Sequence, residues 1–122
     1  MEIPLSNVFV ISVASTLRPE GEFLSENDRS TRYSHSGVIK IVTEEIGYGS
    51  SGVARLNGNI LKQEGDALPI TASIPGIGNN IVVGFNRIWS SHLNGSGHFS
   101  YQLTSMYHPR NTITASIDIR SP

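Results

Sequence analysis

The chain has 122 residues, a formal net charge of −1 and no cysteine, and only 16% of its residues are charged, against roughly 25% in typical globular proteins. The near-zero net charge excludes the strongly basic surfaces that bind nucleic acid or anionic membranes. The absence of cysteine excludes disulfides, thiolate metal sites and a cysteine nucleophile. The length predicts one domain, residues 1–122, with a core of its own.

The charged residues are unevenly distributed along the chain. Within residues 67–122 the ionic side chains are Arg87, Arg110, Asp118 and Arg120, and serine, threonine, asparagine and histidine occupy many of the other positions. This composition indicates outward faces made of neutral hydrogen-bonding groups. Such faces suit a glycan or a partner protein better than a phosphate or a charged substrate.

The N-terminal sequence lacks the features of a targeting segment. It begins with Glu2 and has no basic region before its apolar run, so it does not match a signal peptide. No apolar run approaches the ~20 residues of a transmembrane helix. We therefore expect synthesis in the cytoplasm, and an extracellular or virion role stays open.

The first third of the chain predicts two strands separated by a polar segment. Residues 8–14 form an apolar run rich in β-branched residues, which predicts a strand covered on both faces or nearly so. The polar segment 16–36 predicts either a functional loop or a short strand near Phe23. Residues 38–43 predict the second long strand.

The clearest local signal is a tight turn in the middle of the chain. Asn57 and Gly58 separate two short runs, residues 53–56 and 59–62. An Asn-Gly pair is the preferred centre of a type I′ turn, because both central positions need a positive φ. The pair therefore predicts a β-hairpin.

Two further strands follow the hairpin. Residues 68–74 predict a strand with Pro69 near its start, which indicates either an edge position or a strand that begins after the proline. Residues 81–89 predict a central strand, in which Gly84 marks a bulge or a close approach of two backbones.

The last two predicted strands show the cleanest pattern. Residues 98–107 and 112–119 alternate between apolar and polar residues, with a slip in the phase at Ser105 and Met106 that predicts a bulge. Alternation with period two predicts strands with one face in the core and the other face outward. Together the predicted elements form a single-domain antiparallel β-sandwich, jelly-roll-like, with about eight strands and no helix.

The chain carries few signals for catalysis or metal binding. It has no P-loop, no dinucleotide fingerprint and no HExxH motif. Glu44 and Glu45 are unsuited to flank one glycosidic bond, because adjacent strand residues point to opposite faces. Charged side chains are mostly exposed, so we expect this pair at a solvated strand end, and we expect His35 in a solvated loop. His92 and His98 have no third metal ligand nearby in the sequence. We therefore expect a non-enzymatic protein without a cofactor or a metal.

The strongest functional signal is a group of aromatic and polar residues in the second half. Sugars present both apolar faces and hydroxyls, so their sites combine an aromatic platform with a few placed hydrogen-bonding groups. Trp89 can supply such a platform, although a tryptophan on a strand also fits a core position. We predict a lectin-like or receptor-binding module for a neutral glycan or a cell-surface ligand. Its predicted contact residues are Trp89, His92, Asn94, His98, Tyr107, His108 and Arg110.

Three alternatives stay open. The low charge also fits the interface of a homo-oligomeric structural or assembly subunit of a virion, tail fibre or surface appendage. Residues 98–107 and 112–119 are candidates for a membrane-inserting pore hairpin, but the second run is short and the link contains a proline and an arginine. An enzyme would need His92 or His98 in a cleft beside a serine or a carboxylate, with a perturbed pKa.

Overall fold

The computed structural model describes residues 3–122, which form an all-β structure. These residues contain no helix that is long and apolar enough to cross a membrane. The ten strands are β1 (Asn7–Ser15), β2 (Glu22–Phe23), β3 (Ser30–Ser34), β4 (Gly37–Ile46), β5 (Gly49–Leu56), β6 (Asn59–Ile60), β7 (Lys62–Ile74), β8 (Gly78–Leu93), β9 (Gly97–Ser105) and β10 (Thr112–Arg120).

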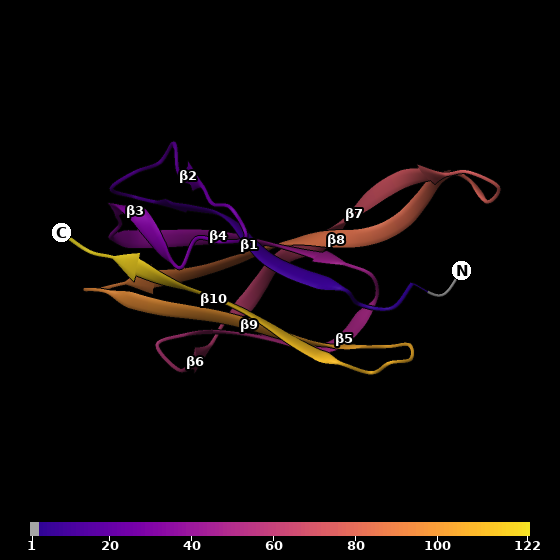
Figure 1. Ribbon diagram of the computed structural model, residues 1–122. Coiled ribbons are helices and arrows are strands. Elements are labelled where there is room, and N and C mark those ends of the chain that lie inside the picture. The colour runs from indigo at the N-terminus through magenta and orange to yellow at the C-terminus, as the bar shows by residue number, and fades with distance from the viewer. Residues whose placement is uncertain (1–2) are drawn as a thin grey trace.

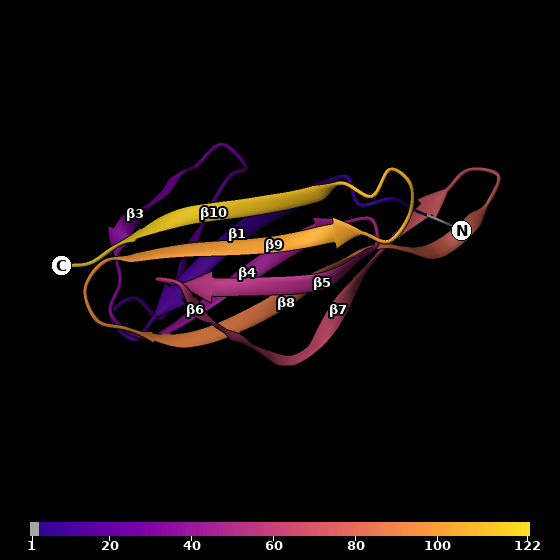
Figure 2. The same cartoon turned by 90° about the horizontal axis from the view of Figure 1, so that it is seen from below.

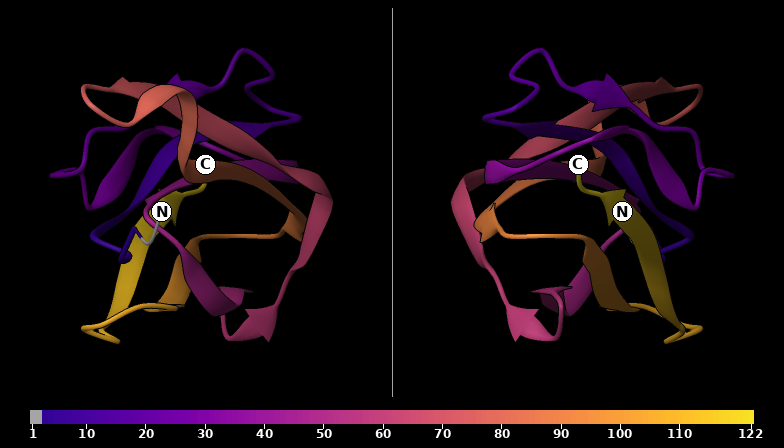
Figure 3. Two further views of the ribbon diagram at one scale, coloured as in Figure 1. Left: turned by 90° about the vertical axis from the view of Figure 1, so that its right-hand side faces the viewer. Right: turned by 90° about the vertical axis from the view of Figure 1, so that its left-hand side faces the viewer.

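The strands form two five-stranded sheets, with the orders β2-β1-β4-β8-β7 and β3-β10-β9-β5-β6. Neighbouring strands are antiparallel except β3 and β10, which are parallel. The sheets pack face to face (Figure 1, Figure 2), and the two layers are also visible end-on (Figure 3). The predicted antiparallel β-sandwich is therefore confirmed.

The core lies between the two sheets, where alternate residues of each strand point inward. On β9, for example, Phe99, Tyr101 and Leu103 are buried, whereas Gln102 is exposed. Burying a side chain such as Phe or Leu contributes about 1.5–3 kcal/mol, so a register slip of one residue would expose the whole row. Other core residues include Val10, Val13, Ile39, Ile41, Trp89, Ile117 and Ile119.

Three local predictions are confirmed by the backbone. Asn57 and Gly58 have φ values of 51° and 83°, as a type I′ turn requires, and they join β5 to β6. β7 is an edge strand, and β8 lies between β4 and β7. Gly84 lies so close to the neighbouring strand that a Cβ atom would overlap the carbonyl oxygen of Glu45.

The polar segment between β1 and β4 contains more regular structure than the sequence predicts. It includes β2, which ends at Phe23 as predicted, and also β3, which the sequence does not predict. The β3 residues, STRYS, have neither an apolar run nor an alternating pattern. Strand β9 ends at Ser105, so the slip in the sequence pattern marks the start of a loop rather than a bulge.

Candidate functional site

The outer face of β9 and β10 consists mainly of neutral polar groups, in agreement with the alternation of these segments. Hydroxyl and amide side chains lie opposite one another across the two strands, and charge is confined to one end. The facing pairs are His98 with Asp118, Ser100 with Ser116, Gln102 with Thr114, and Thr104 with Thr112. This face can donate and accept hydrogen bonds along its whole length.

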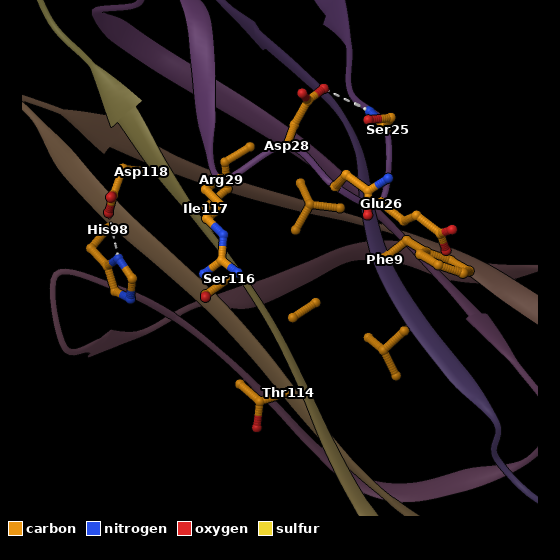
Figure 4. Close-up of a pocket in the computed structure, with 14 residues that line it drawn as sticks. Phe9, Ser25, Glu26, Asp28, Arg29, His98, Thr114, Ser116, Ile117 and Asp118 are labelled. Atoms are coloured by element: carbon orange, nitrogen blue, oxygen red, sulfur yellow. Dashed lines mark hydrogen bonds and ion pairs between the residues drawn. The ribbon is translucent and has the colours of Figure 1, made fainter.

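A groove lies between β10 and β1, at one edge of the sandwich. β10 pairs with β3 only at Asp118 and Arg120, and β1 pairs with β2 only at Ser12 and Val13. The earlier part of each strand has no strand partner on that side within residues 3–122. These two open edges and the loop of residues 25–29 enclose a cavity of about 460 Å³ (Figure 4).

The groove combines an apolar wall with hydroxyl, amide and charged groups. Phe9 lies on one side and His98 on the other, with Arg29 between them (Figure 4). Thr114 and Ser116 of β10 contribute hydroxyls. The other polar residues that line it are Ser25, Glu26, Asn27, Asp28 and Asp118. Because three carboxylates accompany one arginine, the lining disfavours an anionic ligand.

His98 and Asp118 form a pair at the end of the groove. His98 Nδ1 lies 2.7 Å from Asp118 Oδ1. An ionised carboxylate only accepts hydrogen bonds, so Nδ1 donates, and in the neutral imidazole Nε2 is then left to accept one from a ligand hydroxyl. The two side chains are 60% and 68% exposed, and solvent screening leaves such a pair little effect on stability. The pair is therefore better placed for recognition than for folding.

The loop that covers the groove is held in position from both ends. Asp28 Oδ2 accepts the backbone N–H of Ser25 at 2.8 Å and lies 3.4 Å from Arg32 Nη1. The backbone N–H of Asp118 donates to the carbonyl oxygen of Arg29 at 2.9 Å. The covering wall of the groove is thus preformed, which lowers the entropic cost of binding.

A second polar constellation lies where β1, β2 and β3 meet. Ser15 Oγ lies 2.8 Å from His35 Nδ1, and His35 Nε2 lies 2.8 Å from Glu22 Oε1. The expectation of a solvated His35 is wrong, because its side chain is fully buried. A hydroxyl, an imidazole and a carboxylate in this order resemble a hydrolytic triad. However, Ser15 is only 6% exposed and also accepts the N–H of Arg18 at 3.2 Å.

The surroundings of this constellation indicate a structural role. A neighbouring cavity of about 230 Å³ is lined by Ser15 but not by His35 or Glu22. Burial would raise the pKa of Glu22, but hydrogen bonds from His35 and from the N–H groups of Arg32 and Tyr33 outweigh it and hold the pKa below its ordinary value. The hydrogen bonds that join Ser15, His35 and Glu22 hold the short strands β2 and β3 against β1.

A third polar cluster lies inside the sandwich and centres on Glu45. Its side chain is completely buried, so the expectation of a solvated Glu45 is wrong. Arg87 Nε and Tyr101 Oη each donate to Glu45 Oε1 at 2.8 Å. Arg87 Nη1 also donates to Gln63 Oε1 at 2.9 Å. A cation and a hydroxyl donor therefore compensate a carboxylate that could not otherwise be buried.

The pKa values of Tyr101 and Arg87 are both raised in this cluster. Burial raises the pKa of Tyr101, and the hydrogen bond to Glu45 raises it further. Burial lowers the pKa of Arg87, but the contact with Glu45 outweighs it and the pKa lies above its ordinary value. Tyr101 keeps its proton and Arg87 its charge, so the cluster stabilises the interior rather than exchanging protons.

Trp89 belongs to the core, and its prediction as a contact residue is wrong. It is 5% exposed, its Nε1 donates to Thr43 Oγ1 at 2.9 Å, and its ring lies 5.2 Å from that of Tyr101. The indole N–H finds its partner inside the sandwich, so the side chain needs no contact with solvent. Trp89 does not offer a platform to a ligand.

The other six predicted contact residues lie at opposite ends of β9. Strand β9 has nine residues, and a strand of that length spans about 30 Å. The two groups are His92, Asn94 and His98 before or at the start of β9, and Tyr107, His108 and Arg110 after it. They do not form one site for a small ligand, and His98 alone lines the groove.

Several groove residues are absent from the sequence-based prediction. The alternation of β10 indicates that Thr114, Ser116 and Asp118 face outward, but it does not show that anything lies beside them. Phe9 and Arg29 come from distant parts of the chain, and only the packing of β1 and the loop against β10 brings them there. No local sequence signal reports that packing.

The chain matches no curated protein and no solved structure. Residues 3–119 match the model of one family, described as a domain of unknown function (DUF4879). The match covers β1 to β9 in full and β10 up to Ile119, and it includes every residue of the groove. The chain therefore belongs to the DUF4879 family.

Proposed function

We propose that this protein is a non-enzymatic binding module that recognises a neutral, hydroxyl-rich ligand such as a glycan in the groove between β1 and β10. The observation that carries the proposal is the lining of the groove, where Phe9, Thr114 and Ser116 accompany His98 and Asp118. An aromatic ring can contact the CH face of a sugar, while hydroxyls and the free imidazole nitrogen bind its hydroxyl groups.

The size and charge of the groove support the same ligand class. Its volume of about 460 Å³ falls within the roughly 300–1,000 Å³ of typical ligand sites. Glu26, Asp28 and Asp118 outnumber Arg29 in the lining. A neutral or amino sugar is therefore favoured over a uronic acid or a sulfated sugar, which the carboxylates would repel.

A glycan array followed by titration of the best ligand tests the proposal. His98→Ala should weaken binding about tenfold or more, because a hydrogen bond to a buried ligand hydroxyl is lost. The matched control is His92→Ala, since His92 is exposed and lies outside the groove. The proposal fails if the wild-type protein binds no glycan, or if both histidine variants bind as well as the wild type.

A pair of threonine variants tests the position of the ligand independently. Thr114→Val removes a groove hydroxyl while keeping the shape of the side chain. Thr112→Val makes the same change two residues earlier on β10, outside the groove lining. Weaker binding is expected for Thr114→Val and unchanged binding for Thr112→Val, and the opposite order would place the ligand elsewhere on the sheet.

A second candidate function is hydrolysis of the bound ligand. His98 lies in a groove beside the carboxylate of Asp118, and Ser116 lines the same groove, which is the placement of side chains that an enzyme would require. Chromatography of the ligand after prolonged incubation with the protein distinguishes hydrolysis from binding alone. A product that forms with the wild type and not with Asp118→Asn would favour hydrolysis, and intact ligand in both cases would favour binding alone.

A further inference from the structure

The edge strand β7 carries an unprotected segment beyond the body of the sandwich. β7 is the last strand of its sheet, so one side of its backbone has no strand partner within residues 3–122. The β7–β8 ribbon projects past the other strands at one end of the molecule (Figure 1, Figure 2). A partner strand can therefore approach this edge without meeting the rest of the sandwich.

The projecting part of β7 is regular. Its register with β8 shifts between Ile70 and Thr71 and again between Ala72 and Ile74, and both times the extra residue belongs to β8. β7 itself therefore continues without a bulge through this segment. Beyond Pro69 its outward N–H and C=O groups keep the regular repeat that another strand needs for pairing.

Charged side chains and bulges are absent from this edge, and its two prolines, Pro69 and Pro75, lie at the ends of the segment. Proteins commonly protect edges with lysine or other charged side chains, with proline, or with bulges. Residues 67–86 contain no charged residue at all. The nearest charge on β7 is Asp66, which lies beside the irregular part of the strand between Glu64 and Leu68. The edge is thus open to pairing, and its composition tolerates burial.

The sequence of this edge reads almost the same in both directions. Residues 69–75 are Pro-Ile-Thr-Ala-Ser-Ile-Pro, a chemical palindrome centred on Ala72. In an antiparallel pair formed across a two-fold axis at this residue, Ile70 faces Ile74, Thr71 faces Ser73, and Ala72 faces its own copy. Chemically similar side chains therefore face each other, with the aliphatic side chains on one face of the pair and the hydroxyls on the other.

We propose that residues 69–75 pair with the same residues of a second copy of this chain, so that two sheets join into one across a two-fold axis. Two-fold interfaces use the same patch on both subunits. In the register centred on Ala72, the palindrome also places chemically similar residues opposite each other. No charges oppose each other in this register, because residues 69–75 contain no charged side chain. The groove lies at β1 and β10, not at β7, and stays open in the dimer.

The first test is the solution mass of the full-length protein across a range of concentrations. Light scattering should show a dimer, about twice the 13.2 kDa of the chain. Ala72→Lys should weaken dimerisation about tenfold or more, because two ammonium groups then oppose each other at the axis. A wild-type protein that is monomeric at every concentration overturns the proposal, and so does an Ala72→Lys variant that dimerises like the wild type.

A charge-swap experiment tests the register itself. Ala72→Lys and Ala72→Asp should each be monomeric alone and should dimerise when mixed, since only a register with position 72 opposite itself pairs the two charges. Gln102→Lys, at an exposed position of β9, is the matched control and should leave the dimer intact. Circular dichroism of each variant verifies folding. Recovery of the dimer in the mixture supports the axis at Ala72, and its absence overturns it.

A single introduced cysteine gives an independent readout. The chain has no cysteine, so Ala72→Cys can form a disulfide only with another copy. Facing residues of an antiparallel pair have Cα atoms about 4.5–5.5 Å apart, within the roughly 4.4–6.8 Å that a disulfide spans. Rapid cross-linking is expected for Ala72→Cys and not for Gln102→Cys. Equal rates for the two variants would contradict the proposed register.

Discussion

Tyr101 donates a hydrogen bond of 2.8 Å to Glu45, a carboxylate that is completely buried between the two sheets. Tyr101→Phe removes this donor without changing the ring and should lower the free energy of unfolding by about 1–3 kcal/mol. Tyr33→Phe, at a position that is 45% exposed, should change it by less than about 0.5 kcal/mol. Urea unfolding measures both, and equal losses would contradict the assigned role of Tyr101.

Arg87 supplies the positive charge that makes the burial of Glu45 possible. Arg87→Met leaves the carboxylate uncompensated and should cost about 3–5 kcal/mol. Adding Glu45→Gln to that variant should recover part of the loss, because a neutral amide needs no cation while its oxygen still accepts from Tyr101. Urea unfolding of the single and double variants forms the test. A double variant less stable than Arg87→Met would show that charge compensation is not the reason for the contact.

Glu22 should make stability depend on pH in the acid range. Its pKa is lowered in the folded protein, so its contribution is complete above the ordinary glutamate pKa of about 4.3 and is lost as the pH falls through the lowered value. Glu22→Gln should reduce stability at neutral pH and flatten the acid part of the stability curve. Glu26→Gln, at an exposed position, should leave the curve unchanged. If both variants follow the wild-type curve, Glu22 does not carry this dependence.

The β10 strand shows how much of this fold is readable from the sequence. Its alternation predicts that Ile117 and Ile119 face inward and that Ser116 and Asp118 face outward, and the structure agrees. This works because the side-chain period of a strand is two, so a half-buried strand carries its orientation in its own residues. The Asn57-Gly58 turn is predictable for a similar reason, because the positive φ at each of its two central positions depends on the residue at that position.

Local sequence patterns do not predict which polar side chains are buried. Glu45 and His35 have sequence neighbours typical of solvated segments, and only their partners make burial possible. Arg87 is 42 residues from Glu45, and Glu22 is 13 residues from His35. The groove depends in the same way on where β3 stops pairing with β10, which is a property of the assembled sheets.

Trp89 offers a spectroscopic test of its position, because it is the only tryptophan of the chain. Its 5% exposure predicts a blue-shifted emission and little quenching by iodide in the native protein, with a red shift and strong quenching after unfolding in urea. Saturation with a groove ligand should leave the emission nearly unchanged. Native emission that is readily quenched by iodide would restore Trp89 as a surface residue and a candidate platform.

Gly84 lies where β8 and β4 approach too closely for any residue with a Cβ atom. A Cβ atom at this position would overlap the backbone carbonyl oxygen of Glu45, and because that obstacle is main chain, relief requires the two strands to separate. Gly84→Ala should therefore cost about 3 kcal/mol, the upper range for overpacking. It should also disturb Glu45, whose side chain is held by Arg87 and Tyr101.

The matched control for this prediction is Gly95→Ala. Gly95 has a φ of 82° and no atoms near its missing Cβ, so its replacement adds conformational strain of about 1–2 kcal/mol without a clash. Urea unfolding should rank Gly84→Ala as clearly the less stable variant. Equal losses would mean that β4 and β8 have room for a methyl group, and that the interior network tolerates a shift between the two strands.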